Sequence, residues 1–249
     1  MQYGICNLSI VPLRIEPNDP SELVSQVLYG ELFKVLEQRK TWSRIRLAFD
    51  KYEGWIDNKQ YLEISEDDYK NLKQQPHKLS TDLIEYIQNK NSQLYTIPVG
   101  SSLNGLELLN HSFDGNFIET KQDKSNLIST AFLYLNAPYL WGGKTPFGID
   151  CSGFTQMVYK LNGYHILRDA SQQATQGLAL SFIEESEPGD LAFFDNQDGL
   201  ITHVGIIMED NYIIHAHGKV RIDRLDHSGI YNVDRQLHTH KLRVIKKII

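Results

Sequence analysis

Hydrophobic and polar positions alternate along the first quarter of the chain. A period of two places every second side chain on the same face of a strand, so this pattern is typical of half-buried β-strands. Proline, glycine and aspartate separate the alternating stretches, as they do in small barrels of short strands. The predicted strands cover 6–10, 31–36, 42–47 and 53–56. Residues 1–64 are therefore predicted to form a small all-β barrel.

The stretch that follows has a weaker pattern. Ser65 and the acidic residues after it are similar to the capping box that opens a helix. Residues 82–88 carry their apolar side chains on one side, which favours a short helix. Glycine and proline interrupt the apolar runs further on. We predict a connector or a degenerate second β-module over residues 65–120.

From residue 121 the apolar period changes to that of a helix. Asp123 precedes a periodic run and is predicted to cap a helix whose inner positions are Ile128, Ala131, Phe132 and Leu135. A second amphipathic helix is predicted from Cys151 to the Asn162–Gly163 pair. Strands are predicted at 191–194, 203–208, 212–216, 219–225 and 241–248. Helices followed by a meander of strands predict an α+β domain over residues 121–249.

Composition narrows the classes of function. The 249 residues are 41% hydrophobic and 22% charged, which is typical of a globular chain with a sizeable core. With 25 Lys+Arg against 31 Asp+Glu the formal charge is −6, which argues against nucleic acid or an anionic membrane as the main partner. The start lacks the basic and apolar regions of a secretion signal, and no apolar run is long enough to span a bilayer. We therefore expect a cytoplasmic protein with reduced thiols.

The two cysteines have different surroundings in the sequence. Cys6 lies in a predicted strand without polar partners, which is typical of a small buried residue. Cys151 lies between a glycine-rich turn and a helix, so its sulfur is expected in the first helical turn. There the helix dipole and free N–H groups favour a thiolate, although the charge of Asp150 opposes it. Cys151 is the candidate nucleophile.

A cysteine nucleophile needs a base, and that base needs an orienting partner. His203 begins an apolar strand, and Gly205 leaves space on the same face. His215 follows twelve residues later, a separation that suits pairing across a hairpin turned at 209–211. We predict that His203 acts as base and that the ring of His215 accepts its Nδ1–H.

A metal site is the competing interpretation of the histidines. His215 and His217 share one strand face, and His238 and His240 repeat this spacing. Zinc needs three or four convergent ligands, however, and no further cysteine or HExxH motif is spaced to supply them. We expect no metal and no other cofactor.

The segments around these residues resemble a known family. Residues 121–249 resemble the NlpC-type cell-wall peptidases, which are papain-like cysteine hydrolases of bacterial peptidoglycan peptides. The resemblance lies in the ordered segments 138–143, 148–154, 168–173, 188–191, 203–206 and 214–216. It implies Cys151 as nucleophile, His203 as base and His215 as the polar third member. It also implies that the Tyr139 hydroxyl holds the oxyanion together with the Cys151 N–H.

The N-terminal module also resembles a known domain, and the combination of the two modules implies a class of substrate. Residues 1–64 resemble a bacterial SH3-like domain through 14–17 and 52–56. Linked in this order, the modules resemble the γ-D-glutamyl-diamino acid endopeptidases of murein-peptide recycling, in which the SH3-like module admits only peptides with a free N-terminal L-Ala. The implied substrate-binding residues are Glu16, Tyr52 and Asp150 for the ammonium, Ser152 with Ser171 or Asp169 for the D-Glu carboxylate, and Trp141.

The expected partner is therefore a murein tripeptide or tetrapeptide. Two alternatives stay open at this point. The same triad could serve an amidase or an acyltransferase, because a thioester intermediate permits either reaction. The chain could also be a non-catalytic peptidoglycan-binding protein whose SH3-like module binds the ligand, although such a module has no reason to keep a nucleophile beside a base. The sequence leaves the oligomeric state open.

Overall fold

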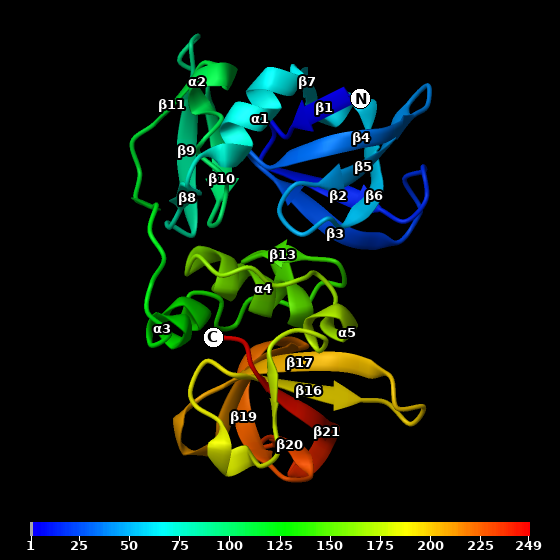
Figure 1. Cartoon of the computed structure of the whole chain (residues 1–249), viewed down its shortest axis with the longest axis vertical. Helices are drawn as coiled ribbons and strands as arrows, with labels where there is room; N and C mark the ends of the chain where they lie inside the picture. Colours follow the sequence, from blue (N-terminus) through cyan, green and yellow to red (C-terminus); the bar gives the residue numbers. More distant parts are fainter. Residues whose placement is uncertain (1) are drawn as a thin grey trace. The chain divides into compact units, whose positions relative to one another are not determined.

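The computed structural model describes residues 2–249, and these separate into two compact units (Figure 1). The first unit runs to Lys121 and includes the later segment Trp141–Pro146. The second unit consists of Gln122–Leu140 and Phe147–Ile249. Both units contain their own clusters of buried apolar side chains. Each is described below by itself.

An antiparallel sheet forms the N-terminal part of the first unit. In spatial order its strands are β3 (Leu23–Leu28), β2 (Ile10–Arg14), β6 (Glu53–Asp57), β5 (Trp42–Leu47), β4 (Leu32–Gln38), β1 (Gln2–Ile5) and β7 (Leu62–Ile64). Buried and exposed positions alternate along β5, as expected for a strand with one wet face. Val11, Phe33 and Ile45 are among the buried side chains that form the core of this sheet.

The strand predictions in this region are partly confirmed. The stretches at 31–36, 42–47 and 53–56 correspond to β4, β5 and β6. The strand predicted at 6–10 is wrong, because Cys6 lies in the turn between β1 and β2. Its backbone N–H donates to the Glu31 carbonyl at 3.0 Å, and its carbonyl accepts from Gly30 at 2.8 Å. Turn hydrogen bonds of this kind replace the ladder that the alternation suggested.

The rest of the first unit joins a helix to small sheets. Helix α1 (Glu66–Gln74) begins as predicted, because the Ser65 hydroxyl accepts from the Asp68 N–H at 3.0 Å. The remaining elements are β8 (Leu79–Ser80), β9 (Ile84–Asn89), β10 (Leu94–Pro98), α2 (Leu106–Leu109), β11 (His111–Phe113), β12 (Phe117–Ile118) and β13 (Lys144–Thr145).

The helix predicted at 82–88 is wrong, because β9 occupies this position between β10 and β11. Of its side chains only Ile87 is buried, and it packs with Tyr29, Ile97 and Leu103. Cross-strand pairing on both sides satisfies the backbone of β9, which decides the structure over a short helical pattern. The division of the chain at 64 and 120 stays a prediction, since the β9 sheet lies in the same compact unit as the barrel strands.

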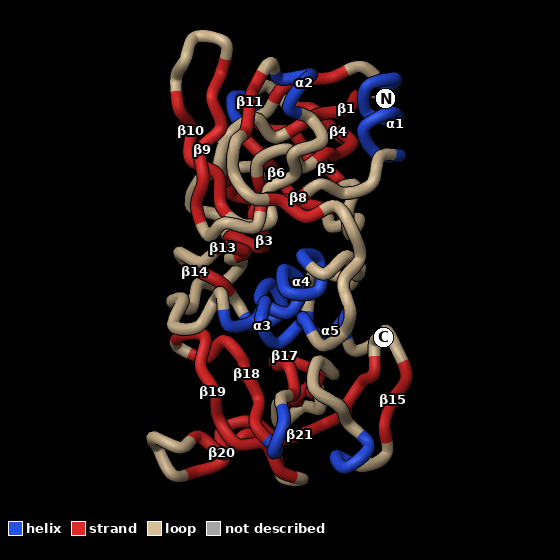
Figure 2. Tube along the Cα trace, turned by 90° about the vertical axis from the view of Figure 1, so that its left-hand side faces the viewer, coloured by secondary structure: helices blue, strands red, loops and turns tan. Residues whose placement is uncertain are grey.

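The second unit combines helices with a curved antiparallel sheet. Its helices are α3 (Asn126–Phe132), α4 (Cys151–Leu161) and α5 (Ala170–Gln173), and a short strand, β14 (Gly148–Ile149), precedes α4. The strands of the sheet, in spatial order, are β15 (Leu178–Leu180), β21 (Leu237–Lys247), β16 (Leu191–Asp195), β17 (Ile201–Ile207), β18 (Tyr212–His217), β19 (Lys219–Asp226) and β20 (Gly229–Asn232). Strand β20 also pairs with β21. Helices α4 and α5 pack against β17, α4 also contacts β18, and α3 packs against α4 (Figure 2).

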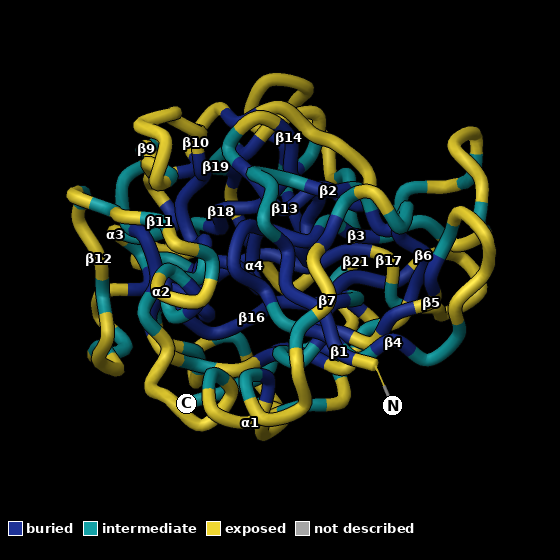
Figure 3. The backbone as a smooth tube through the Cα atoms, turned by 90° about the horizontal axis from the view of Figure 1, so that it is seen from above, coloured by how far each residue is buried: buried dark blue, intermediate teal, exposed yellow. Residues whose placement is uncertain are grey.

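Helix α4 is the central element of this unit and is buried along its whole length (Figure 3). The Asp150 carboxylate caps it by accepting from the Gly153 N–H at 2.6 Å. Gly163, with φ +79°, follows its end as predicted. The preceding helix is shorter than predicted. It starts at Asn126 rather than after Asp123, and it buries Leu127 and Ala131 while Phe132 is exposed. The apolar face therefore lies about one residue away from the predicted one.

Short 3₁₀ helices at Asn58–Gln60, Ile183–Glu185 and Glu209–Asn211 complete the structure. Among residues 2–249, no helix has both the length and the apolar character needed to cross a membrane.

Candidate active site

Cys151 is the first residue of α4, as the sequence predicts. Its side chain is buried, with 6% of its surface exposed. Backbone hydrogen bonds from Val204 and Ser152 stabilise the thiolate, but burial and the neighbouring charge of Asp150 outweigh them and raise the pKa of the thiol to about 12. The resting state of Cys151 is therefore a thiol, not the thiolate expected from its place at a helix start.

His203 and His215 face each other across the hairpin formed by β17 and β18. Nε2 of His203 lies 2.8 Å from Nδ1 of His215. Gly205 pairs directly with His215, and a Cβ on this glycine would lie 2.9 Å from the His215 Cβ. The glycine is thus needed for the close approach of the ring. The prediction that His203 uses its Nδ1–H is wrong, since its ring presents Nε2 to His215.

Burial determines the charge of this histidine pair. His203 is 6% exposed and His215 is fully buried. Burial lowers the pKa of His203 well below its usual range, and the neighbouring histidines add to the shift. Burial also lowers the pKa of His215, although Asp223 acts in the opposite direction. Both rings are therefore neutral near pH 7.

Two more histidines lie at the entrance to this pair. His240 stacks on His203, with ring centroids 4.1 Å apart, and His217 lies 4.8 Å from His240. Both line a hollow of about 380 Å³ that also reaches His203 and Tyr139. In the sequence His240 entered only the metal-site alternative, so its contact with the predicted base is one that the sequence reasoning missed. Within residues 2–249 no group of three or more His, Cys, Asp or Glu side chains is placed to hold a metal ion.

Asp150 takes part in a buried network with Arg168 and Ser152. Its carboxylate accepts from Arg168 Nη2 at 2.7 Å and from Arg168 Nη1 at 3.0 Å. Arg168 Nη1 also donates to the Ser152 hydroxyl at 3.0 Å. The guanidinium lowers the pKa of the Cys151 thiol and so counteracts part of the effect of Asp150. In the sequence Arg168 appears only as the first residue of the segment 168–173. Its contacts with Asp150 and Ser152 depend on the fold and could not be recognised from the sequence.

A carboxylate that the sequence reasoning missed lies behind His215. Asp223, on β19, is fully buried, and its Oδ2 lies 3.1 Å from His215 Nε2. Arg221 binds both oxygens of this carboxylate, at 2.7 and 2.9 Å. The signal in the sequence was a pair of opposite charges, two residues apart, in a strand next to the one that carries His215.

Tyr139 is at the edge of the same hollow as His203. Its backbone N–H donates to the Gly218 carbonyl at 3.0 Å, which fixes the chain beside β18. Burial together with the charges of Cys151 and Asp150 raises the pKa of the Tyr139 hydroxyl to about 12. The hydroxyl therefore keeps its proton near pH 7 and is available as a donor.

The other predicted substrate-binding residues fall into two groups. Asp169 is half-buried before α5, where its N–H donates to the Gln172 side chain at 3.1 Å, and Ser171 is exposed on that helix. Glu16, Tyr52 and Trp141 belong to the first unit. There Glu16 is exposed, Tyr52 packs against the barrel core, and the Trp141 indole N–H donates to Glu22 at 2.7 Å.

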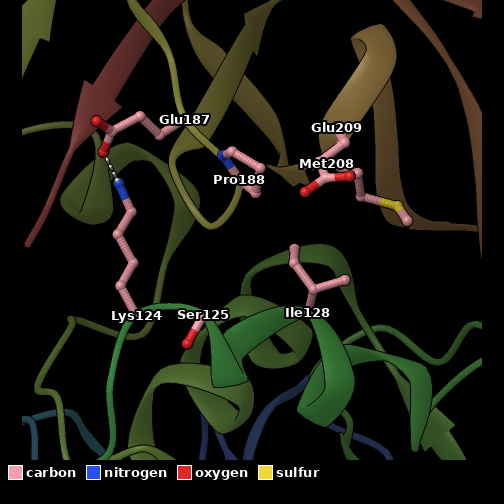
Figure 4. Close-up of a pocket in the computed structure, with 7 residues that line it drawn as sticks. All are labelled: Lys124, Ser125, Ile128, Glu187, Pro188, Met208 and Glu209. Atoms are coloured by element: carbon pink, nitrogen blue, oxygen red, sulfur yellow. Dashed lines mark hydrogen bonds and ion pairs between the residues drawn. The ribbon is translucent and has the colours of Figure 1, made fainter.

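A larger hollow of about 480 Å³ lies elsewhere in the second unit (Figure 4). Its lining contains Ile128, Pro188 and Met208, and its cation, Lys124, donates to Glu187 at 2.9 Å and to Asp190 at 2.8 Å. Neither a cysteine nor a histidine faces this space. The smaller hollow beside His203 is therefore the candidate site, despite its size.

Comparisons with known proteins identify the families that two parts of the chain match. Residues 136–239 match the NlpC/P60 family, and residues 13–60 match the bacterial dipeptidyl-peptidase SH3 domain. The chain therefore carries an NlpC/P60 domain behind a bacterial SH3 domain, which confirms the resemblance noted from its sequence.

The relatives narrow the class further. Dipeptidyl-peptidase 6 of Lysinibacillus sphaericus is 29% identical over 252 residues, covering 86% of this chain and 88% of the relative. Gamma-D-glutamyl-L-lysine dipeptidyl-peptidase of Bacillus subtilis is 28% identical, covering 77% and 71%. The crystal structure of an NlpC/P60 family protein from Bacillus cereus shares the fold, with a TM-score of 0.81 at 20% identity over 99% of both chains. The protein is a cysteine peptidase with a papain-like α+β fold.

Proposed function

We propose that the chain hydrolyses the bond between γ-D-Glu and the following diamino acid in peptidoglycan-derived peptides with a free N-terminal L-Ala. The observation that carries this proposal is that the Cys151 sulfur lies beside the backbone N–H of Val204, the residue after His203, whose ring in turn contacts His215. Relatives of the chain include enzymes named gamma-D-glutamyl-L-lysine dipeptidyl-peptidase. The SH3 domain, of the kind named for bacterial dipeptidyl-peptidases, supports the same substrate class.

The reaction begins with the neutral pair at rest. As the Cys151 sulfur attacks the γ-carbonyl of D-Glu, its proton passes to His203, so that a C–S bond forms while the S–H bond breaks. The Cys151 N–H and the Tyr139 hydroxyl hold the oxyanion, and such donors contribute about 3 kcal/mol each in related chemistry. His203 next gives the proton to the departing amine, which leaves a thioester. Water activated by His203 then releases the dipeptide and restores the thiol.

Two buried contacts make this proton transfer possible. The Val204 N–H beside the sulfur and the guanidinium of Arg168 stabilise the negative charge that develops on Cys151. His215 accepts from His203 or holds its ring in place throughout the reaction. Because both histidines are neutral at rest, the imidazolium exists only after Cys151 has lost its proton.

The free amino terminus of the peptide is the second part of the proposal. An ammonium group needs several oxygen acceptors, which Glu16, Tyr52 and Asp150 offer in this proposal. Asp150 already accepts from Arg168 and from the Gly153 N–H, so the larger share of the ammonium contact falls to Glu16 and Tyr52. In this proposal Ser152 with Ser171 or Asp169 binds the D-Glu carboxylate, and Trp141 also contacts the peptide.

The test is product analysis by mass spectrometry with L-Ala-γ-D-Glu-L-Lys as substrate. We expect L-Ala-D-Glu and free lysine from the native chain, and a loss of more than about 10³-fold in Cys151→Ala. Unchanged turnover in this variant would end the assignment of the nucleophile. A new product in the presence of an added amine would identify acyl transfer instead of hydrolysis.

The amino-terminal requirement is tested with N-acetylated substrate and with Glu16→Gln. We expect the acetylated peptide to be a poor substrate and Glu16→Gln to raise KM more than it lowers kcat, because the lost contact is to the ground-state ammonium. Asp19→Asn is the matched control, since Asp19 is an exposed carboxylate of the same loop. Equal cleavage of free and acetylated peptides would remove the ammonium pocket from the proposal.

A further inference from the structure

We propose that Asp223 is a positioning residue for the reaction, because it fixes which nitrogen of His215, and through it of His203, carries the proton. The inference deepens the proposed function and rests on it for the roles of Cys151 and His203. Asp223 lies outside the predicted triad, on the strand β19 next to that of His215.

The surroundings of the Asp223 carboxylate consist of hydrogen-bond donors. Arg221 binds Oδ2 through Nε at 2.7 Å and Oδ1 through Nη2 at 2.9 Å. The Val233 N–H donates to Oδ1 at 3.2 Å, and the Asn232 side-chain amide donates to Oδ2 at 3.4 Å. Burial raises the pKa of this carboxyl group, but the hydrogen bonds from His215 and Arg221 outweigh burial and lower the pKa to about 2, so the group is ionised. Asp223 can therefore only accept hydrogen bonds.

The tautomers of both histidines follow from this charge. Asp223 Oδ2 lies 3.1 Å from Nε2 of His215, so this nitrogen must carry the hydrogen. Neutral His215 then has its lone pair on Nδ1, which is 2.8 Å from Nε2 of His203. Nε2 of His203 must in turn be the donor, and its lone pair is on Nδ1. Nδ1 is thus the base for the Cys151 proton.

The opposite arrangement would disable the base. With hydrogen on Nδ1 of His215, the lone pair of Nε2 would face the Asp223 carboxylate without a proton between them. The hydrogen on Nδ1 would also require Nε2 of His203 as acceptor, and the proton of His203 would then sit on Nδ1, where it blocks transfer from Cys151. Asp223 excludes this state by charge and stabilises the imidazolium formed during the reaction.

The strand offers a natural comparison for this pair. Asp226, three residues further along β19, lies 2.8 Å from Nε2 of His238, so the same type of pair occurs twice. The side chains of the second pair are 42% and 50% exposed and do not line the hollow beside His203. Asp226→Asn is therefore the matched control for Asp223→Asn.

The experiment compares Asp223→Asn and Asp226→Asn in the full chain with the native protein. In Asp223→Asn an amide N–H can donate to His215 Nε2 and reverse the tautomers, so we expect kcat to fall by about 10²-fold or more with KM within about threefold. We expect Asp226→Asn to keep native kcat. A loss of equal size in both variants, or no loss in Asp223→Asn, would overturn the proposal.

A second readout needs neither substrate nor a variant. Long-range ¹H–¹⁵N NMR of the native chain at pH 7 should show hydrogen on Nε2 of both His203 and His215, and hydrogen on Nδ1 of His215 would overturn the inference whatever the variants do.

In Arg221→Gln, which keeps the carboxylate but removes its fork of donors, we expect the same tautomers and a kcat loss of less than about tenfold. If the native tautomers are as expected while the tripeptide is not cleaved, the proposed substrate fails and the role of Asp223 stands.

Discussion

Cys6 and Cys151 are both buried free thiols, and burial raises the pKa of each to about 12. They differ in what lies beside the sulfur. Cys6 packs among apolar side chains of the barrel, where its S–H donates to the Leu8 carbonyl at 3.3 Å. Cys151 receives backbone hydrogen bonds from Val204 and Ser152 and lies at the first turn of a helix. Neither burial nor thiol pKa therefore distinguishes the two cysteines, but the backbone donors beside the Cys151 sulfur and its place at a helix start do.

Alkylation is the experiment in which this difference should be largest. At pH 7 we expect iodoacetamide to modify Cys151 about 100-fold faster than Cys6, because in the proposed mechanism His203 removes the proton as sulfur attacks, whereas Cys6 is fully buried in the barrel core. Peptide mapping by mass spectrometry measures both rates in one sample.

His203→Ala is the control for the alkylation experiment. It should reduce the rate at Cys151 to within about tenfold of the rate at Cys6. A native-like rate at Cys151 in this variant would mean that the sulfur is activated by the helix start alone.

The decrease of kcat/KM at low pH tests whether His203, the proposed base for Cys151, is neutral at rest. The base must be neutral, and burial lowers the pKa of His203, so kcat/KM should stay constant from pH 8 to below 6.5 and fall about tenfold per pH unit only under the lowered pKa. The ring of His240 contributes to this lowering. In His240→Ala the limb should therefore move to higher pH, toward the ordinary value for histidine.

The measurement is kcat/KM against pH for the native chain and for His240→Ala. Glu209→Gln serves as a control, because Glu209 lines the larger hollow and not the one that contains His203. A native limb centred above pH 6.5 would contradict the neutral histidine pair at rest.

The sequence predicted the part of the site that is determined by residues close together in the chain. Cys151 at a helix start and His203 with His215 across a hairpin follow from the apolar period and from turn residues, and the structure has both elements. Asp223 and His240 could not be found in this way, since they meet the histidines only through the pairing of β19 and the stacking of β21. The choice of His203 nitrogen was missed for a similar reason, because ring orientation depends on packing against neighbouring strands.

The fold was predictable to a similar depth. Alternation identified β4, β5 and β6, and the cap at Ser65 located α1. In the second unit β16 to β19 and β21 were predicted, whereas β14, β15 and β20 were missed. The stretch 82–88 failed because its apolar residues fit a helical face as well as a strand, and the neighbours that decide between them, β10 and β11, lie later in the chain. Short segments of this kind are determined by partners, not by their own residues.

The smallest expected effect is on the free energy of unfolding. Here the substitution of Cys6 should matter more than that of Cys151, whereas for activity the order is reversed. Cys6→Ala removes a buried sulfur from the barrel core and leaves a small cavity, so we expect it to lower the free energy of unfolding by about 1 kcal/mol while kcat/KM stays within about twofold of native. Cys151→Ala should do the reverse, because Cys151 is the proposed nucleophile and, at 6% exposed, is less completely buried than Cys6. Its loss should therefore change the unfolding transition less than Cys6→Ala does. Urea denaturation followed by tryptophan fluorescence measures both variants against the native chain. If Cys6→Ala reduced activity as strongly as Cys151→Ala without unfolding, the contrast between a packing thiol and a reacting thiol would be lost.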